Sequence, residues 1–365
     1  MTIKKIPFFT LEREYRLHEK HINAAVTRVL RSQQFILGRE TELFEKEFAA
    51  YLGVRHAIGV GSGTDGLILA LLAVGIKKGD EVITQANSFV ATAEAISFVG
   101  AKAVFVDINP ATYQIDMLDL SNKITKRTKA IIPVHMYGAP GPIREVITFA
   151  KKNALFVIED ACQAHGATFE GKKLGTFGDI GVFSFYPSKN LGAYGDAGCV
   201  VTNSASLQKS IAMMRNHGQK TKYFHDTIGI NSRLDEIQAA VLRIKLHYLE
   251  KTNDEHRKNA NLYQSLLTVK MQEIIPGGNS NYYVFVIQIK KRNLLQEFLK
   301  DVGIETMIHY PVPIHLQRPF SQGYKPGSLP ITEGLAKTCL SLPLFTGISP
   351  DEVKYVSEKV NSFQN

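Results

Sequence analysis

Short apolar runs alternate with helical patterns over the first two thirds of the chain, and this alternation limits the possible folds more than any other feature. The runs have the length of strands, and the segments between them have helical periodicity. The expected strands are 56–60, 81–84, 102–106, 129–134, 155–159, 180–185 and 198–201, and the expected helices between them are 64–74, 89–99 and 142–153. This order predicts an α/β protein with a mostly parallel central sheet and helices on both faces. Ligands bind such sheets at the carboxyl ends of the strands.

The two ends of the chain have a different pattern. Residues 1–34 and 40–52 are expected to be mostly helical, and 233–256 reads as one long helix. A strand over 282–289, a helix over 292–302 and a closing helix over 350–362 complete the order. We therefore expect a large domain over 1–249, including the N-terminal segment, and a smaller α+β domain over 250–365.

Composition excludes several classes of protein. The 365 residues are 44% hydrophobic and 21% charged, as in ordinary globular proteins. The net charge of +9 is spread along the chain, which favours a basic cleft for a small anion over a nucleic-acid surface. No apolar run has the length of a membrane span or a signal peptide. We expect neither nucleic acid nor a membrane as a partner. The three dispersed cysteines fit no disulfide framework, so a reducing cytoplasm is expected.

One lysine stands at a special position. The expected strand 180–185 stops at Pro187, and Lys189 follows in a glycine-dense loop that leads to the next apolar run. Proline and glycine exclude regular structure here. A lysine on such a loop can be an amine nucleophile that forms a Schiff base with a carbonyl. The alternative is a surface lysine beside a turn.

A second loop, Gly59 to Gly66, joins a strand to a helix. Gly63 lets the backbone approach an anion closely, the helix start offers free N–H groups, and Thr64 adds a hydroxyl. The loop has neither the Walker pattern nor the dinucleotide glycine spacing. It is either a phosphate site or an ordinary helix start.

Two further residues occupy comparable positions. Asp160 follows the buried strand 155–159, where its carboxylate could pair with a cationic ring nitrogen, bind a metal or cap a turn. His165 is a possible neighbouring ligand, but no zinc spacing surrounds it, so no metal is expected. Phe89 opens the next helix and either stacks on a flat ligand or belongs to the core.

Together these residues predict a cofactor. Pyridoxal phosphate needs a lysine for its aldehyde, an aspartate for its ring nitrogen and an anion site for its phosphate. Lys189, Asp160, and Gly63 with Thr64 supply this set on loops of one sheet. An aspartate keeps the pyridine protonated, so that the ring accepts electrons from a substrate carbanion.

Several stretches resemble the DegT/DnrJ/EryC1/StrS sugar aminotransferases of the aspartate aminotransferase superfamily. They occur in the family's order, and the similarity covers nearly the whole chain. The matching stretches are 61–64, 87–92, 159–166, 183–192 and 231–240. The resemblance implies the fold of PLP-dependent transferases of the aspartate aminotransferase type I, and a cytoplasmic homodimer with shared active sites.

The resemblance also implies roles for individual residues. Lys189 carries the Schiff base and moves the proton, and Asp160 pairs with the pyridine nitrogen. Gln163 lies near the ring hydroxyl and Phe89 stacks on the ring. The expected phosphate contacts are Gly63, Thr64, Ser184 and, from the partner subunit, Asn231. Relatives that dehydrate sugars carry histidine at the position of Lys189, so the lysine favours transamination.

Two stretches, 133–138 and 308–317, resemble members that aminate carbon 3 of a nucleotide-linked keto-6-deoxyhexose. In the second, two prolines stiffen the loop, and its residues either face a sugar or pack rigidly. The expected substrate contacts are His309, Tyr310, His315 and Tyr186. The basic stretch 215–223, with Lys220 and Lys222, either binds a nucleotide diphosphate or is a solvated loop.

The implied activity is transfer of an amino group from glutamate to carbon 3 of a dTDP-linked 3-keto-6-deoxyhexose. Such reactions serve the biosynthesis of deoxyamino sugars for O-antigen (lipopolysaccharide), S-layer glycans or natural products. The alternatives are amination of carbon 4, a UDP-linked substrate, and a non-catalytic regulatory protein that has kept the cofactor.

Overall fold

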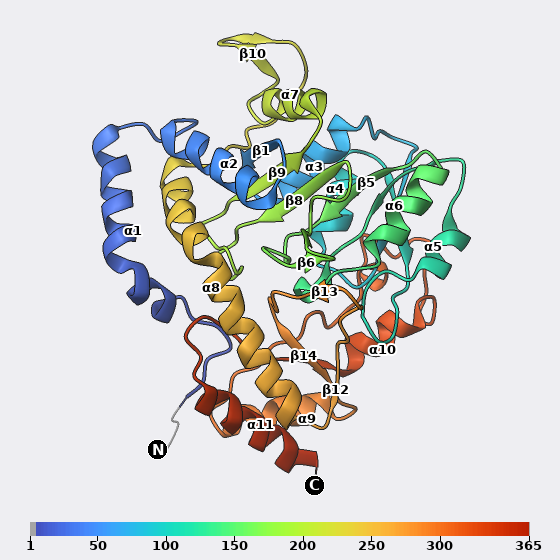
Figure 1. Cartoon of the computed structure of the whole chain (residues 1–365). Helices are drawn as coiled ribbons and strands as arrows, with labels where there is room; N and C mark the ends of the chain where they lie inside the picture. Colours follow the sequence, from blue (N-terminus) through green and yellow to red (C-terminus); the bar gives the residue numbers. More distant parts are fainter. Residues whose placement is uncertain (1–4, 365) are drawn as a thin grey trace.

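A seven-stranded sheet forms the centre of the computed structural model, which describes residues 5–364 (Figure 1). Its strand order is β1-β9-β8-β5-β4-β2-β3. The bounds are β1 (His56–Val60), β2 (Glu81–Gln85), β3 (Lys102–Val106), β4 (Thr128–Ile132), β5 (Phe156–Asp160), β8 (Ile180–Ser184) and β9 (Gly198–Thr202). Neighbouring strands from β8 to β3 are parallel, and only β9 runs antiparallel to its two neighbours. The predicted mostly parallel sheet is confirmed.

Each face of this sheet has its own apolar core, because successive strand residues point to opposite sides. Val182 and Val200 belong to one core, and their neighbours Phe183 and Val201 belong to the other. The first core is covered by α3 (Gly63–Ala73), α4 (Ala91–Phe98) and α7 (Ala205–Met214). The second is covered by α2 (Arg39–Leu52), α5 (Met117–Lys123), α6 (Ile143–Lys152) and the first part of α8 (Glu236–Leu266). Helices on both faces are the predicted arrangement.

The C-terminal part has a separate core around a three-stranded sheet. Its strands are β12 (Lys270–Met271), β14 (Phe285–Gln288) and β15 (Cys339–Leu342), in the order β12-β14-β15. Helices α9 (Arg292–Asp301) and α11 (Pro350–Gln364) pack on it together with the end of α8. Since α8 runs without a break through residues 249 and 250, the predicted domain boundary falls inside a continuous helix. The division into two domains stays a prediction.

The N-terminal segment contacts this C-terminal core. Ile6 is fully buried and forms a parallel bridge with Ile304. Helix α1 (Glu12–Ser32) then lies along α8 (Figure 1). Residues 1–4 of the predicted N-terminal helical region lie outside the described residues.

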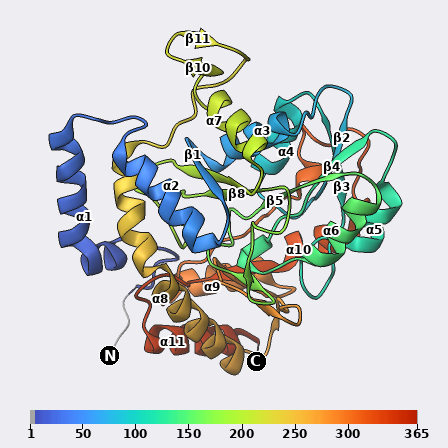
Figure 2. The same cartoon turned by 45° about the horizontal axis from the view of Figure 1, so that its top comes forward.

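Several elements are absent from the sequence prediction, among them α5, α7, β12 and β15. The most exposed is a hairpin of β10 (Gln219–Thr221) and β11 (Phe224–His225), which projects beyond α7 (Figure 2). The others are β6 (Thr168–Phe169), β7 (Lys172–Lys173), β13 (Gly278–Asn279), α10 (Pro330–Thr338), and the 3-10 turns Met136–Gly138 and Ile314–Leu316. None of the helices in residues 5–364 combines the length and apolar character that a membrane crossing needs.

Candidate active site

A cavity of about 700 Å³ lies where β1, β5 and β8 end, between the central sheet and segments of the C-terminal part. Most of the predicted site residues lie on its wall. They are Gly63, Thr64, Phe89, Asp160, Gln163, Ser184, Tyr186, Lys189, His309 and Tyr310. The cavity therefore brings together residues that are up to 247 positions apart in the sequence, from Gly63 to Tyr310.

Lys189 occupies a tight turn after β8. Its backbone N–H donates to the carbonyl of Tyr186 at 2.8 Å. A Cβ on Gly192 would lie 2.4 Å from the carbonyl oxygen of Pro187, so the loop closes only with glycine there. The ammonium Nζ lies 4.0 Å from the ring centroid of Tyr283, a cation–π distance. The amine thus stands on the cavity wall at a fixed position, as the sequence predicts for a nucleophile.

Asp160 is the last residue of β5 and is almost completely buried. The hydroxyl Oγ1 of Thr92 donates to its Oδ2 at 2.8 Å, and the backbone N–H of Cys162 donates to its Oδ1 at 3.2 Å. Each carboxylate oxygen therefore has one donor and keeps a lone pair. A protonated ring nitrogen is a suitable further partner for such a carboxylate.

The start of α3 has the features that an anion site requires. Ser62 caps the helix by accepting from the N–H of Asp65 at 3.1 Å, and the first N–H groups of a helix have no partner within it. A Cβ on Gly63 would lie 2.7 Å from the Cβ of Ser184, so only glycine permits this approach of the two segments. Gly63, Thr64 and Ser184 all line the cavity, which places a helix start and two hydroxyl-bearing residues where a phosphate could bind.

Aromatic rings line another part of the wall. The rings of Phe89 and Tyr310 lie 5.8 Å apart, and Phe89 is 53% exposed, so its face is open to a ligand. The imidazole Nδ1 of His309 lies 2.8 Å from the hydroxyl of Ser341. Burial, and secondarily the charge of Lys189, lowers the pKa of His309 to about 4. His309 is therefore neutral at physiological pH and offers a hydrogen bond without a charge.

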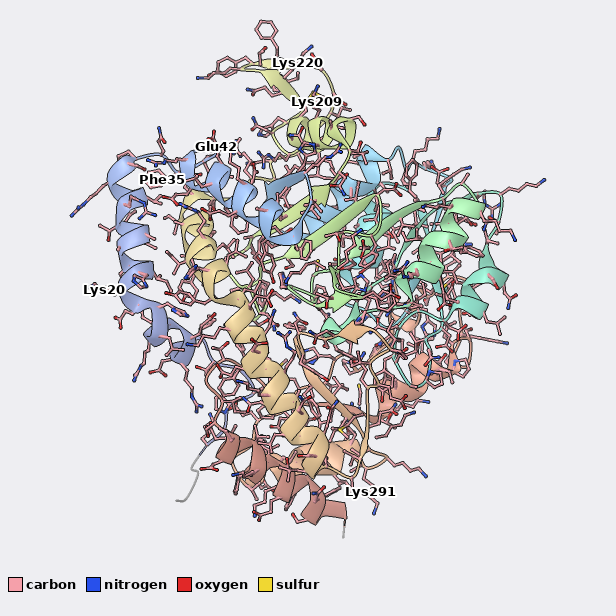
Figure 3. All side chains as sticks on the ribbon, in the orientation of Figure 1. Lys20, Phe35, Glu42, Lys209, Lys220 and Lys291 are labelled. Carbon is pink, nitrogen blue, oxygen red and sulfur yellow. The ribbon has the colours of Figure 1, made fainter. Side chains whose placement is uncertain are left out.

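Four predicted residues lie away from this cavity. His315 is fully buried, and its Nε2 pairs with Glu333 at 3.1 Å, which corrects the expectation that it faces a sugar. The 3-10 turn Ile314–Leu316 directs its side chain inward. Lys220 and Lys222 lie on the projecting hairpin, as Figure 3 shows for Lys220, and Asn231 is exposed on the loop before α8. None of these three contributes to the cavity of its own chain.

The sequence interpretation missed some residues of the wall. Thr92 lies three positions after Phe89, and residues three apart share one face of a helix. This spacing could have indicated that Thr92 also faces the cavity. Tyr283 is at the start of the expected strand 282–289, where an aromatic residue reads as packing. Phe8 comes from the N-terminal segment, which carries no signal for a site. Within residues 5–364, no group of three or more His, Cys, Asp or Glu side chains is arranged to hold a metal ion.

The residues present fit pyridoxal phosphate. The helix start at Gly63 and Thr64 offers unpaired N–H groups to a phosphate, the carboxylate of Asp160 can accept a ring N–H, and Lys189 supplies an amine on the same cavity. Fold and site together define a pyridoxal-phosphate-dependent aminotransferase. The chain belongs to the DegT/DnrJ/EryC1/StrS aminotransferase family, whose model matches residues 17–361.

Curated relatives extend over nearly the whole chain. A "pleiotropic regulatory protein" of Geobacillus stearothermophilus is 44% identical, covering 98% of both chains. The dTDP-3-amino-3,6-dideoxy-alpha-D-galactopyranose transaminase of Aneurinibacillus thermoaerophilus is 42% identical, over 98% of this chain and 99% of that protein. A UDP-N-acetyl-3-dehydro-alpha-D-glucosamine 3-aminotransferase of Acidithiobacillus ferrooxidans is 41% identical, over 96% of each. The relatives thus use more than one nucleotide carrier.

Solved structures show the same fold. DesV of S. venezuelae, in complex with a ketimine intermediate, superposes with a TM-score of 0.96 at 40% identity, over 98% of both chains. NtdA from Bacillus subtilis, with bound PMP, superposes with a TM-score of 0.91 at 32% identity, over 99% of this chain and 86% of that one. These likenesses confirm the predicted fold and cofactor class.

Proposed function

We propose that this enzyme transfers an amino group from glutamate to carbon 3 of a dTDP-linked 3-keto-6-deoxyhexose. The observation that carries the proposal is that Lys189 and Asp160 line the same cavity as the expected sugar contacts His309 and Tyr310. A relative with 42% identity is named for a dTDP-3-amino-3,6-dideoxyhexose. The product is a precursor of deoxyamino sugars, for surface glycans such as O-antigen or for natural products.

The cofactor, when bound, supplies an aldehyde that accepts the amino group and a ring that stabilises negative charge. The chain's own residues do the rest. Gly63, Thr64 and Ser184 would bind the phosphate, Asp160 would hold the proton on the ring nitrogen, and Phe89 would cover the ring. As the uncharged amine, Lys189 Nζ removes the proton from the glutamate carbon that bears the amino group. In the second half-reaction it gives a proton to the sugar carbon that receives the amino group. Neutral His309 hydrogen-bonds the sugar without placing a second positive charge near Lys189.

We also propose a homodimer in which each subunit completes the other's site. Asn231, Lys220 and Lys222 are exposed and lie away from the cavity of their own chain, so a partner subunit can use them. Asn231 then contacts the phosphate of the cofactor, and the lysines contact the diphosphate of the nucleotide. A cytoplasmic location accords with the free thiols of Cys162, Cys199 and Cys339.

A panel of dTDP- and UDP-linked 3-keto and 4-keto sugars with glutamate tests the substrate. NMR of the product assigns the aminated carbon. Amination at carbon 4, or a preference for UDP sugars, would replace the proposed substrate with the corresponding alternative. Amination is expected to be fastest with the dTDP-3-keto-6-deoxyhexose.

Lys189→Ala tests the reaction itself. This variant should lose the visible absorption of the bound cofactor, because Lys189 forms the Schiff base with it. Its turnover should fall by at least about a thousandfold, because Lys189 also moves the proton. Lys291→Ala, a change of an exposed lysine before α9, is the matched control and should behave like the wild type. Unchanged turnover in Lys189→Ala would contradict the assignment.

A regulatory protein that only binds the cofactor is the second candidate, since a relative with 44% identity is named a pleiotropic regulatory protein. Glutamate should bleach the visible cofactor band of an aminotransferase within one turnover. A band that glutamate leaves unchanged would favour the regulatory function.

A further inference from the structure

Four rings form a continuous row along the cavity wall. The ring centroids of Phe8 and His309 are 5.7 Å apart, those of His309 and Tyr310 are 5.3 Å apart, and those of Tyr310 and Phe89 are 5.8 Å apart. All four residues line the cavity. The row begins at the expected cofactor plate, Phe89, and ends at Phe8 in the N-terminal segment.

Phe8 is held firmly at its end of the row. The N–H of Ile6 donates to the carbonyl of Gly303 at 2.8 Å, and the N–H of Glu305 donates to the carbonyl of Ile6 at 2.9 Å. The N–H of Phe8 itself donates to the carboxylate of Glu305 at 3.3 Å. The N-terminal segment is thus attached to the same C-terminal part that carries His309.

A second attachment lies just after Phe8. The guanidinium of Arg13 binds both carboxylate oxygens of Glu352 at 2.7 Å and the carbonyl of Gly347 at 2.8 Å. Bidentate pairs of this kind fix geometry as well as adding energy. Attachments on both sides of Phe8 make its ring a preformed part of the wall.

The chemistry of the wall favours an apolar ring face at Phe8. Among the described residues that line the cavity, Lys189 is the only lysine or arginine, and the carboxylates of Glu14 and Asp196 add negative charge. Phe8 offers no hydrogen bond, so it discriminates by shape and dispersion alone. A pyranose presents a face of C–H groups that packs on an aromatic ring, whereas glutamate is a short chain with two carboxylates and has no such face.

We propose that Phe8 is a specificity-determining residue for the sugar half of the reaction. Its ring packs against the C–H face of the pyranose and extends the row Phe89, Tyr310 and His309 to the outer part of the substrate. Glutamate, in the other half of the reaction, does not use this ring. The inference rests on the proposed function, because it requires a nucleotide sugar as the second substrate.

Equilibrium binding separates the sugar contact from the nucleotide contact. The probes are dTDP-glucose, which has no ketone and cannot react, and dTDP alone. With the holoenzyme, Phe8→Ala should weaken dTDP-glucose binding by about tenfold or more, and dTDP binding by less than about threefold, because only the pyranose meets the ring. Equal weakening of both ligands would overturn the proposal.

The two half-reactions give an independent measurement. Phe8→Ala should lower kcat/KM for the keto sugar by about tenfold or more, mainly through KM, while the rate of cofactor bleaching by glutamate stays within about threefold of wild type. Phe8→Tyr keeps an aromatic ring at this position and should therefore keep most of the activity toward the sugar. Phe98→Ala, a change of a 76% exposed phenylalanine at the end of α4, is the matched control.

The outcomes distinguish this inference from the proposed function. A wild-type enzyme that aminates none of the keto sugars would overturn both. A wild-type enzyme that aminates them, with equal losses in the two half-reactions of Phe8→Ala or with no loss in the sugar half, would overturn the role of Phe8 alone. If Phe8→Ala does not fold, Phe8→Leu replaces it, with the same expected direction and the same criteria.

Discussion

The hydroxyl of Thr92 donates a 2.8 Å hydrogen bond to Oδ2 of Asp160, and both side chains are buried. The hydroxyl of Ser88 lies 3.1 Å from that of Thr92 and can donate to it in turn. Thr92 therefore helps to fix the orientation of the Asp160 carboxylate, which we propose pairs with the ring nitrogen of the cofactor. It acts through Asp160, which makes it a positioning residue.

Thr92→Val should weaken cofactor binding to the apo-enzyme by about tenfold or more, because a hydrogen bond to a buried charged group contributes about 1.5–3 kcal/mol. Thr92→Ser keeps the hydroxyl and should stay close to wild type. Titration of the apo-enzymes with pyridoxal phosphate, followed by absorbance, measures both affinities. Similar affinities for the valine and serine variants would contradict the role of the hydroxyl.

Glu236 stabilises the start of α2 from a distant position in the sequence. Its buried carboxylate accepts from the N–H groups of Gly38, Glu40 and Thr41 at 2.8–2.9 Å. A carboxylate at a helix N-terminus accepts hydrogen bonds from the unpaired N–H groups and is attracted by the positive end of the helix dipole. Glu236→Gln should therefore destabilise the protein by about 2–4 kcal/mol, and denaturation by urea or heat measures the loss.

The control for this prediction is Glu297→Gln, on the exposed side of α9. Surface changes of this kind stay within about 0.5 kcal/mol. A stability of Glu236→Gln equal to that of the control would show that the capping carboxylate contributes little.

Buried histidines predict how stability depends on pH, and His165 and His256 show the effect. Burial lowers the pKa of His165 from 6.5 to about 3 and that of His256 from 6.5 to about 4. In the unfolded chain both rings take up a proton near pH 6.5, whereas in the folded protein they stay neutral until a lower pH. Stability is therefore complete above pH 6.5 and falls as the pH decreases toward 4, by up to about 1.4 kcal/mol per pH unit for each histidine.

Melting or urea denaturation at several pH values between 5 and 7 measures this effect. Carboxylates with a lowered pKa, such as Glu40 and Glu352, lose their contribution only below about 4.5, so they act outside this interval. His165→Leu removes one titrating ring, while His256 and His309 remain, and should make the dependence shallower. A stability that does not change between pH 7 and 5 would contradict neutral burial of these histidines.

The sequence predicts those residues of the candidate site whose chemical type and local sequence pattern indicate the same position. Pro187 and the glycines around Lys189 exclude regular structure, and an apolar run before Asp160 places it at the end of a strand. The structure places both residues on one cavity, as the pattern predicts. His315 shows the limit, because a stiff loop does not reveal which of its side chains points inward, and the pairing with Glu333 decided that.

The sequence by itself determined the alternation of strands and helices, hence the parallel sheet, and the kinds of side chain at its carboxyl edge. These follow from periodicity and from the conformations of proline and glycine, which are local properties. Only the tertiary structure decided which residues meet across long separations: Thr92 with Asp160, Tyr283 with Lys189, and Phe8 with His309. Such contacts depend on how the N-terminal segment and the C-terminal part pack against the sheet, and no local pattern encodes that packing.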